Sequence, residues 1–572
     1  MTFSDHIINA IRQLGRAIRV RGFRHTALLA LGVLWREGPS GIRARLDALG
    51  PALRPGRAAG PRAALILTTP HTLHFAQRMA GVMAEAGWQA ELSDTPRHAR
   101  DFNLIIAFAP QNFPDLPPGH SIAFQIEPHG AWPRWGADYP AGLARFRAVF
   151  DYSTANIERL RAWLPLRKLY HVPFSPLPAR RGATPRQGAL FYGDASTPRR
   201  QAMLAELRRH VPELEIETNL FGPAMQARLE RAAVIVNIHA TTGAVLESAR
   251  LSEALAAGAV VVSETAPDQA DYPEMASRVR FTPEGDTAAM ADAIRRLLDE
   301  PAALAAMQAE AAAPACDRFR LGILRAMQGL DLISPKEFRN LASDYPPPFD
   351  GQTEGGGMPR LCLSLPETPA RWRGFVSRQP GWPVWPGMKA DPGWRGCALS
   401  YRHMMRALRD AGTPEALIVE DDVILPPDFD HRLTLARAVM DRRGADMFSG
   451  LIVDLHPDTR ILAVDEIGGI TFVTLDRAVM MICNLYRRRM IDWLADWDDS
   501  DPNAFTNTID RHMERATHLR VVTTLPFTAG YQRAAASSLR ESGNDRYDAL
   551  LAQSNALLAQ KLAAFRASDP LS

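Results

Sequence analysis

The stretch that decides the fold is LESARLSEALAAGAVVVS, residues 246–263. Its first part, 247–257, predicts a helix that Gly258 closes, because glycine is the usual residue just beyond a helix C-terminus. The apolar run 260–263 follows at once and predicts a buried strand. A helix that leads directly into a buried strand is typical of parallel α/β sheets.

The same alternation extends on both sides of this stretch. Upstream, strands are predicted at 63–67, 104–108, 121–126 and 148–151, with helices at 75–86 and 154–163. Nearer to it, strands are predicted at 189–192, 214–217 and 234–238, with helices at 198–210 and 288–299. The run 173–187 is rich in Pro and Arg and predicts a linker. We therefore expect one Rossmann-like lobe at 62–178 and a second at 188–330.

A second linker divides the chain near residue 350. Residues 343–359, SDYPPPFDGQTEGGGMP, are rich in Pro and Gly and lack periodicity. Alternation of strands and helices resumes from 360 to 535, and the tail 545–567 predicts an amphipathic helix. The predicted fold class is α/β, with two Rossmann-like lobes followed by a third α/β domain.

Composition excludes several classes of protein. The chain has 572 residues, of which 46% are hydrophobic and 23% charged, which excludes wholesale disorder. The longest uncharged apolar stretch is too short to cross a bilayer. The four cysteines lie far apart without a CxxC pair, which suits a reducing compartment such as the cytoplasm. The net charge of +3 is too small to indicate a nucleic-acid partner.

The N-terminal segment 1–60 is distinctly basic, with ten Arg against three acidic residues. Its apolar stripe Ile7, Ile11, Leu14 and Ile18 predicts a basic amphipathic helix. Such a helix attaches peripherally to the anionic inner membrane surface, or it packs on the protein with a solvated arginine face. Both interpretations stay open, and either leaves a cytoplasmic protein.

Three adjacent acids mark the third domain. The predicted strand 416–419 ends in Glu420, Asp421 and Asp422. Three such carboxylates repel one another unless a counter-charge is present, and a divalent metal, Mg²⁺ or Mn²⁺, supplies that charge and also takes a diphosphate. The alternative is an ordinary solvated loop after a strand.

The order of motifs around this triplet resembles glycosyltransferase family 25, of the lipopolysaccharide biosynthesis type. The motifs are LCLSL at 361–365 followed by Arg-Trp-Arg, GCALSYRH at 396–403 opening a helix, the triplet itself, and TIDRH at 508–512. The resemblance implies a GT-A fold, a nucleotide-sugar donor, and a Mn²⁺ or Mg²⁺ ion.

The same resemblance assigns roles to individual residues. It implies that Glu420 and Asp422 hold the metal, with Asp422 the direct ligand, and that Asp421 contacts the ribose. Asp510 takes the position of the base in an inverting transfer; its alternative is an acid stabilised by a helix N-terminus. Arg402 is assigned to phosphate, with packing on the helix as the alternative.

The front half resembles GT-B glycosyltransferases of the group 1 type. The motifs are FYG at 191–193 leading to Arg199 and Arg200, VNIH at 236–239, and the opening stretch 246–263. A helix N-terminus and arginines hold a diphosphate, while a carboxylate hydrogen-bonds ribose hydroxyls. The donor-binding residues implied are Gly193, Arg199, Arg200, Glu247 and Glu253. Val245 stands where retaining members have a first Glu.

These resemblances imply a two-module glycosyltransferase of bacterial surface polysaccharide biosynthesis, such as lipopolysaccharide or capsule. Its partners are a nucleotide sugar and a glycan or lipid-linked glycan acceptor, and no nucleic acid is expected. The alternative is that only the third domain is catalytic. The GT-B-like half is then a docking or glycan-binding module.

Overall fold

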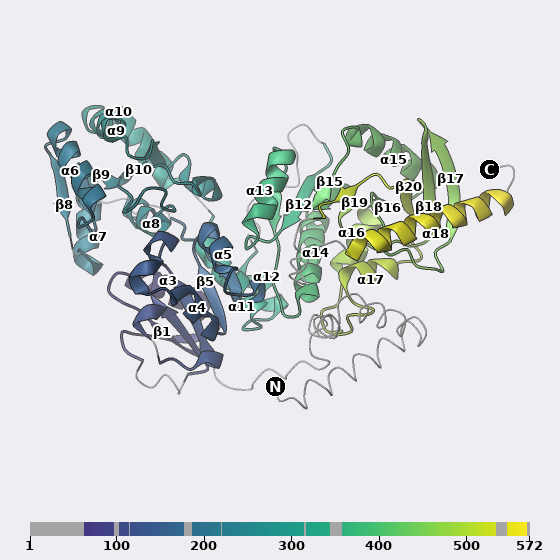
Figure 1. The fold of residues 1–572 in the computed structure, drawn as a ribbon, viewed down its shortest axis with the longest axis horizontal. Helices are drawn as coiled ribbons and strands as arrows, with labels where there is room; N and C mark the ends of the chain where they lie inside the picture. The colour runs from purple at the N-terminus through teal and green to yellow at the C-terminus, as the bar shows by residue number, and fades with distance from the viewer. Residues whose placement is uncertain are drawn as a thin grey trace. The chain divides into compact units, whose positions relative to one another are not determined.

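The computed structural model describes residues 62–96, 102–113, 115–176, 186–218, 220–313, 316–343, 357–533 and 546–568. They form two compact units, one of 62–327 with 336–343 and the other of 357–568 with 328–335 (Figure 1). The predicted helix within 1–60 and most of the linker 343–359 lie outside the described residues.

The first lobe of the front unit is a six-stranded parallel sheet in the order β2-β1-β3-β4-β5-β6. Its strands are β1 (Ala63–Leu67), β2 (Gln89–Ser93), β3 (Leu104–Phe108), β4 (Ser121–Gln125), β5 (Ala148–Asp151) and β6 (Leu169–His171). Its α-helices are α3 (Leu73–Glu85), α4 (Tyr139–Gly142) and α5 (Thr154–Leu160). The four predicted strands are present, whereas β2 and β6 escaped prediction. Both are edge strands, and β2 is polar and half-exposed.

The second lobe is a five-stranded parallel sheet in the order β11-β10-β9-β7-β8. Its strands are β7 (Gln187–Tyr192), β8 (Leu214–Glu217), β9 (Ala232–Asn237), β10 (Val260–Glu264) and β11 (Val279–Thr282). Its helices are α6 (Pro198–His210), α7 (Gly222–Arg231), α8 (Ser248–Ala256), α9 (Thr287–Asp299) and α10 (Pro301–Ala312). One apolar core lies between the sheet and α6 and α9, and another between the opposite face and α7 and α8. The opening stretch 246–263 is therefore α8 and β10, as its pattern predicts.

The chain then returns from the second lobe to the first. Helix α11 (Arg318–Gly329) packs Phe319 against Phe174, with ring centroids 5.6 Å apart. A Cβ on Gly322 of α11 would lie 3.1 Å from Val172 Cα, so only glycine allows this close approach. The sequence assigned these residues to the second lobe, and the structure packs them on the first. The short helix α12 (Pro335–Leu341) follows, and Arg62 pairs with Glu337 at 2.6 Å.

The second unit has an eight-stranded mixed sheet in the order β13-β12-β14-β19-β16-β20-β18-β17. Its strands are β12 (Arg360–Ser364), β13 (Val384–Pro386), β14 (Glu415–Glu420), β16 (Met447–Ser449), β17 (Ile461–Ile467), β18 (Ile470–Leu475), β19 (Cys483–Arg487) and β20 (Val521–Leu525). Its helices are α13 (Pro369–Arg378), α14 (Gly393–Asp410), α15 (Phe429–Arg443), α16 (Arg488–Ala495), α17 (Ile509–Glu514) and α18 (Arg546–Ser568). After the triplet, the short strand β15 (Val423–Ile424) leaves the large sheet and pairs with β21 (Gly530–Tyr531) in a separate two-stranded sheet.

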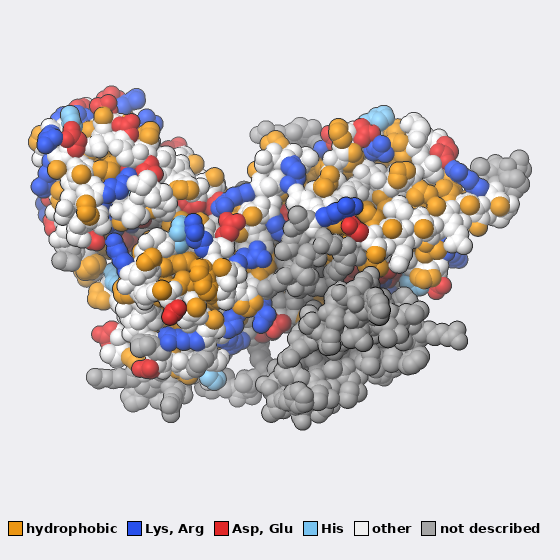
Figure 2. Space-filling model, in the orientation of Figure 1, with side chains coloured by type: hydrophobic (Ala, Val, Ile, Leu, Met, Phe, Trp, Pro, Cys, Tyr) orange, Lys and Arg blue, Asp and Glu red, His pale blue; other side chains and the backbone are white. Residues whose placement is uncertain are grey.

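The described surface mixes charges of both signs. Figure 2 shows basic and acidic side chains interspersed over the face in view, with hydrophobic side chains scattered between them. Within the described residues, no helix has the length and apolar character that a bilayer crossing requires.

Candidate functional site

The first candidate site lies at the carboxyl ends of the strands in the second lobe. The chain runs from β7 outward to β8 and then crosses back to β9 on the other side of β7. The loops that follow β7 and β9 therefore diverge at this point, where open parallel sheets bind their ligands. These loops are 193–197 and 238–247.

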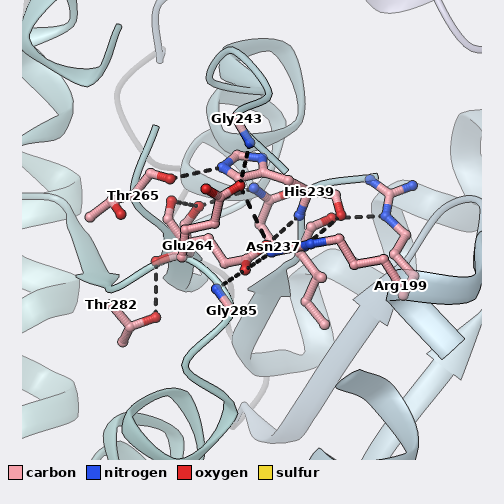
Figure 3. A network of polar contacts seen from close by, with 12 residues as sticks. Arg199, Asn237, His239, Gly243, Glu264, Thr265, Thr282 and Gly285 are labelled. Carbon is pink, nitrogen blue, oxygen red and sulfur yellow. Dashed lines mark hydrogen bonds and ion pairs between the residues drawn. The ribbon is translucent and has the colours of Figure 1, made fainter. Parts of the chain in front are cut away.

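Glu264 at the end of β10 forms hydrogen bonds with residues of several neighbouring segments (Figure 3). It accepts hydrogen bonds from Arg199 Nη1 at 2.8 Å and from the backbone N–H groups of His239 and Gly285, both at 2.7 Å. Burial by itself raises the pKa of Glu264, but these hydrogen bonds outweigh it, so its pKa lies below the usual range. An ionised glutamate thus fixes the loops after β7, β9 and β11.

Arg200 and Glu247 form a second buried pair beside the first. Arg200 donates to the carbonyls of Ile238 and Asp194, each at 2.8 Å, and to Glu247 Oε1 at 2.7 Å. Arg250 approaches the other oxygen of Glu247 at 2.9 Å. Burial raises the pKa of Glu247, but Arg250 and Arg200 outweigh it and lower the pKa below its usual range.

The absence of a side chain at Gly193 leaves room for the Arg250 guanidinium. The backbone of Gly193 has φ +123°, and a Cβ there would lie 2.8 Å from Arg250 Nη2. The Arg250 guanidinium also lies 5.6 Å from the ring centroid of Tyr192. Any side chain at position 193 would displace Arg250, so the predicted glycine acts through this arginine.

Glu253 on α8 faces the first lobe. Its Oε1 lies 2.8 Å from Nε2 of His74 on α3, and its Oε2 accepts a hydrogen bond from the Tyr192 hydroxyl at 3.4 Å. Burial lowers the pKa of His71, while the negative charge of Glu253 opposes that shift. The carboxylate that the sequence assigned to a ribose is therefore placed where the two lobes meet.

Sequence reasoning gave no binding role to four participants of this site. His74 and Glu264 lie outside the quoted motifs, whereas His239 and Arg250 lie within VNIH and 246–263. His239 and Glu264 stand directly after predicted strands, and that position was the available signal. His239 is fully buried, and its Nδ1 has no hydrogen-bond partner among the described residues. No local pattern links His74 to the second lobe, because their contact is made by the fold.

The acidic triplet of the second unit lies at the end of β14, next to β12. Asp421 accepts hydrogen bonds from the Ser364 hydroxyl at 2.5 Å and from Arg371 Nε at 2.8 Å. Arg371 also pairs with Asp422 at 3.2 Å. The arginine-rich segment that follows the first predicted strand thus supplies a cation to the triplet.

One arginine does not offset three carboxylates. Burial raises the pKa of Glu420 to about 8, with the charge of Asp422 adding to the shift and Arg371 opposing it. Burial likewise raises the pKa of Asp421, against the opposing charge of Arg371. Burial and the neighbouring carboxylates thus both disfavour ionisation of Glu420 and Asp421, and Arg371 opposes them.

Asp510 of α17 and Glu420 of the triplet both act on one thiol. Burial raises the pKa of the Cys397 thiol on α14, and the charges of Glu420 and Asp510 both add to that shift. Two carboxylates act on one thiol only when both are near it. The structure thus brings Asp510 and Glu420, which are ninety residues apart in the sequence, to the same helix.

Arg402 is engaged away from the triplet. Its buried guanidinium donates to Asp499 Oδ1 at 3.2 Å and lies 5.3 Å from the ring centroid of Trp497. This placement matches the packing alternative. Its assignment to a phosphate stays a prediction.

The donor set of the triplet suits a hard divalent cation. Within the described residues, no three His, Cys, Asp or Glu side chains are grouped to hold a metal by themselves. Mg²⁺ and Mn²⁺ commonly bind through one or two carboxylates together with substrate phosphates, and Glu420 and Asp422 are neighbouring carboxyl groups whose charges act on each other. Asp422 and Glu420 are the residues that would hold it.

Comparison with known proteins finds a family match within the front unit. Residues 199–321 match the family model described as "Glycosyl transferase-like". This segment holds Arg199, Arg200, Glu247, Glu253 and Glu264 of the site described above, whereas Gly193 and His74 lie outside it. The segment is similar to a glycosyltransferase domain. The prediction of a sugar-transferring enzyme is thereby confirmed for this part of the chain. No curated protein matches the chain.

Several solved structures are similar at low identity. WaaG, a glycosyltransferase involved in lipopolysaccharide biosynthesis, has 14% identity and a TM-score of 0.34, over 46% of this chain and 98% of WaaG. TarM has 12% identity and a TM-score of 0.29, over 36% of this chain. An α-glucosyltransferase in complex with UDP and a 13-mer DNA has 9% identity and a TM-score of 0.31, over 46% of this chain and 95% of its own. The chain spans half the length of TarM, 50%.

Proposed function

We propose that this protein is a two-module glycosyltransferase that builds a bacterial surface polysaccharide such as lipopolysaccharide or capsule. The front unit is a GT-B enzyme of the group 1 type. The second unit is a GT-A-like enzyme of family 25. Each takes a nucleotide sugar and transfers the sugar to a glycan or lipid-linked glycan.

The observation that carries the proposal is the arginine-rich cluster at the strand ends of the second lobe. Arg199, Arg200 and Arg250 converge there with Glu247 and Glu264, inside the segment that matches the family model. Because the pKa of each glutamate is lowered, both remain charged and fix the guanidinium groups at the mouth of the sheet. A preformed basic site at a topological switch point suits a diphosphate.

The remaining parts of the site suit the rest of a nucleotide sugar. Glu253 presents a carboxylate beside Tyr192 for the ribose hydroxyls. Its contact with His74 supports a nucleoside site next to the first lobe. The acceptor therefore enters from the first lobe.

In the second unit, Asp422 and Glu420 would hold a divalent ion, and Asp421 would contact the ribose. The bound cation would neutralise the charge of the departing diphosphate. Asp510, which lies near Cys397 together with Glu420, accepts the proton of the acceptor hydroxyl.

A lipid-linked acceptor requires the sites to work near the inner membrane surface. The basic segment 1–60 supplies the attraction to anionic lipid, with about +7 of formal charge. Binding of the full chain to anionic vesicles should fall as salt rises, and fall again when 1–60 is deleted. Equal binding by the deleted form would leave a purely cytoplasmic enzyme.

The test of the function is hydrolysis of a panel of nucleotide sugars by the full chain, with and without Mn²⁺. Arg250→Met should abolish the metal-independent activity, and Asp422→Asn should abolish the metal-dependent activity. If Arg250→Met changes no turnover, the front unit is the docking or glycan-binding module of the alternative. If neither variant changes turnover, both sites are wrongly assigned.

A further inference from the structure

Asp268 stands in the loop after β10, and its side chain is almost completely buried. Its Oδ1 accepts a hydrogen bond from the backbone N–H of Leu246 at 2.8 Å, and its Oδ2 accepts one from the hydroxyl of Ser153 at 3.1 Å. Ser153 belongs to the first lobe, where it caps the N-terminus of α5, whereas Leu246 belongs to the second lobe. One carboxyl group therefore bonds to both lobes of the front unit.

Leu246 leads directly into the donor site proposed for the second lobe. It precedes Glu247, whose carbonyl accepts the N–H of Leu251 at 3.1 Å in the first turn of α8. The carboxylate of Glu247 in turn pairs with Arg200 at 2.7 Å and with Arg250 at 2.9 Å. The hydrogen bond to the Leu246 N–H therefore fixes the backbone from which these ion pairs are built.

The other end of this connection is fixed within the first lobe. Ser153 is fully buried, its N–H donates to Asp151 Oδ1 at 2.8 Å, and its Oγ accepts the N–H of Asn156 at 3.4 Å. Asp151 also accepts a hydrogen bond from Gln125 Nε2, on the neighbouring strand β4, at 2.7 Å. Because Ser153 is held on both sides, its hydroxyl reaches Asp268 in a fixed direction.

The position of Asp268 is a costly one for a carboxyl group. Burial raises the pKa of Asp268, the hydrogen bonds from Leu246 and Ser153 oppose that shift, and the charge of Asp271 adds to it. Within the part of the chain that the structure describes, no arginine, lysine or histidine forms an ion pair with Asp268. An apolar contact would join the two lobes at less cost, so cohesion of the lobes is a weak explanation for this residue.

Two further hydrogen bonds join the same segments of the two lobes. The Tyr272 hydroxyl donates to the Tyr152 carbonyl at 3.0 Å, and the Thr154 hydroxyl donates to Asp271. The lobes should therefore stay joined when the bond between Ser153 and Asp268 is removed, which allows the effect of that bond on the donor site to be measured in a folded protein.

We propose that Asp268 is a positioning residue of the front unit, which bonds the first lobe to the start of α8 and so holds Glu247 in the orientation that the donor site needs. The inference rests on the donor site proposed for the second lobe. When either bond of Asp268 is lost, binding must fix the start of α8 at its own expense, and the affinity for a nucleotide falls. A residue of the first lobe that lies outside the donor site thus influences donor binding.

The experiment is calorimetric titration of UDP, GDP, ADP or dTDP, each alone, into the full chain in excess chelator. For the nucleotide that the wild type binds, Ser153→Ala should raise Kd by about 5-fold, the effect of one hydrogen bond. Asp268→Ala should raise it by about 10-fold or more. Asp268→Asn should recover part of that loss, because its amide oxygen still accepts the N–H of Leu246. If Asp268→Ala does not fold, Ser153→Ala carries the test.

Ser175→Ala is the matched control. Ser175 is also fully buried, its hydroxyl donates to Asp317 at 3.3 Å, and its Oγ accepts the N–H of Phe319 at 3.1 Å. It therefore has the same kinds of partner as Ser153, but they join the segment after β6 to α11. Ser175→Ala should lower the thermal stability about as much as Ser153→Ala does, while its Kd stays within about two-fold of the wild type.

Hydrogen exchange supplies a second readout. Protection of the segment 246–251 should fall in Ser153→Ala and should be unchanged in Ser175→Ala. Unchanged nucleotide binding in Ser153→Ala, or equal weakening in both serine variants, would overturn the positioning role of Asp268. A wild-type chain that binds none of the four nucleotides would instead contradict the donor site and, with it, this inference.

Discussion

The two acidic strand ends of this chain balance their charges in opposite ways. In the second lobe, Glu247 and Glu264 are paired with three arginines, and their pKa values are lowered. In the second unit, three consecutive acids share Arg371, and burial raises the pKa of Glu420 to about 8. The first site gathers three guanidinium groups around two carboxylates, whereas the second gathers three carboxyl groups around the Arg371 guanidinium. Protein guanidinium groups and a metal ion are the two common solutions to diphosphate binding, and we propose the first for the second lobe and the other for the second unit.

The largest expected effect comes from removing one arginine at each site. Arg200→Met and Arg371→Met should each lower the stability of their own unit by about 3 kcal/mol, because each leaves buried carboxylates under-compensated. Chemical denaturation, with hydrogen exchange to identify the unit that opens, measures the loss. Mn²⁺ should restore the Arg371→Met variant and leave Arg200→Met unchanged. Rescue of both variants, or of neither, would remove the contrast between the sites.

The second prediction concerns turnover in the second unit. Asp422→Asn should lower the Mn²⁺-dependent hydrolysis of a nucleotide sugar by about 100-fold, because it removes the direct metal ligand. Asp458→Asn, an exposed acid of the same unit, is the control and should keep full activity. Equal activity in excess chelator would show that the triplet needs no metal.

The third prediction is a pH response of opposite sign in the two sites. Glu247 and Glu264 have lowered pKa values, so the stability they contribute persists above about pH 4.5 and is lost only at more acidic pH. Glu420 binds its proton more tightly in the folded state, so the second unit should lose stability as pH rises from about 4.5 to about 8.

Hydrogen exchange corrected for intrinsic rates tests this at pH 5 and pH 8 in chelator. Protection of β14 and β19 should fall by up to about 1 kcal/mol per pH unit, while that of β7, β9 and β10 stays constant. Glu420→Gln should flatten the response of β14. A parallel change in both units would contradict the assignment.

Much of the fold was predictable because the core strands are apolar and continuous. The segments at 63–67, 104–108 and 260–263 match β1, β3 and β10 to within a residue at their ends. The edge strands β2 and β6 were missed because short or half-exposed strands lack that pattern. The return of α11 to the first lobe was missed because it depends on the contact of Gly322 with Val172, 150 residues away in sequence.

In the candidate sites too, a local sequence pattern marks some residues, whereas others are brought in only by the fold. Arg199, Arg200 and Glu247 stand at helix starts beside predicted strands, Glu253 lies further along α8, and the structure gathers all four in one lobe. Their partners His74 and Glu264 come from other elements and carry no local signal of the pairing.

The most direct test of the account is calorimetric titration of nucleoside diphosphates into the full chain in excess chelator. The account predicts that one of them binds without metal, and that Glu253→Ala weakens binding by about 1–3 kcal/mol, or about 5- to 150-fold. Glu206→Ala, an exposed residue of the same lobe, should bind as the wild type does. Absence of binding by any common nucleoside diphosphate at millimolar concentration, or equal binding by Glu253→Ala, would contradict the donor site in the second lobe.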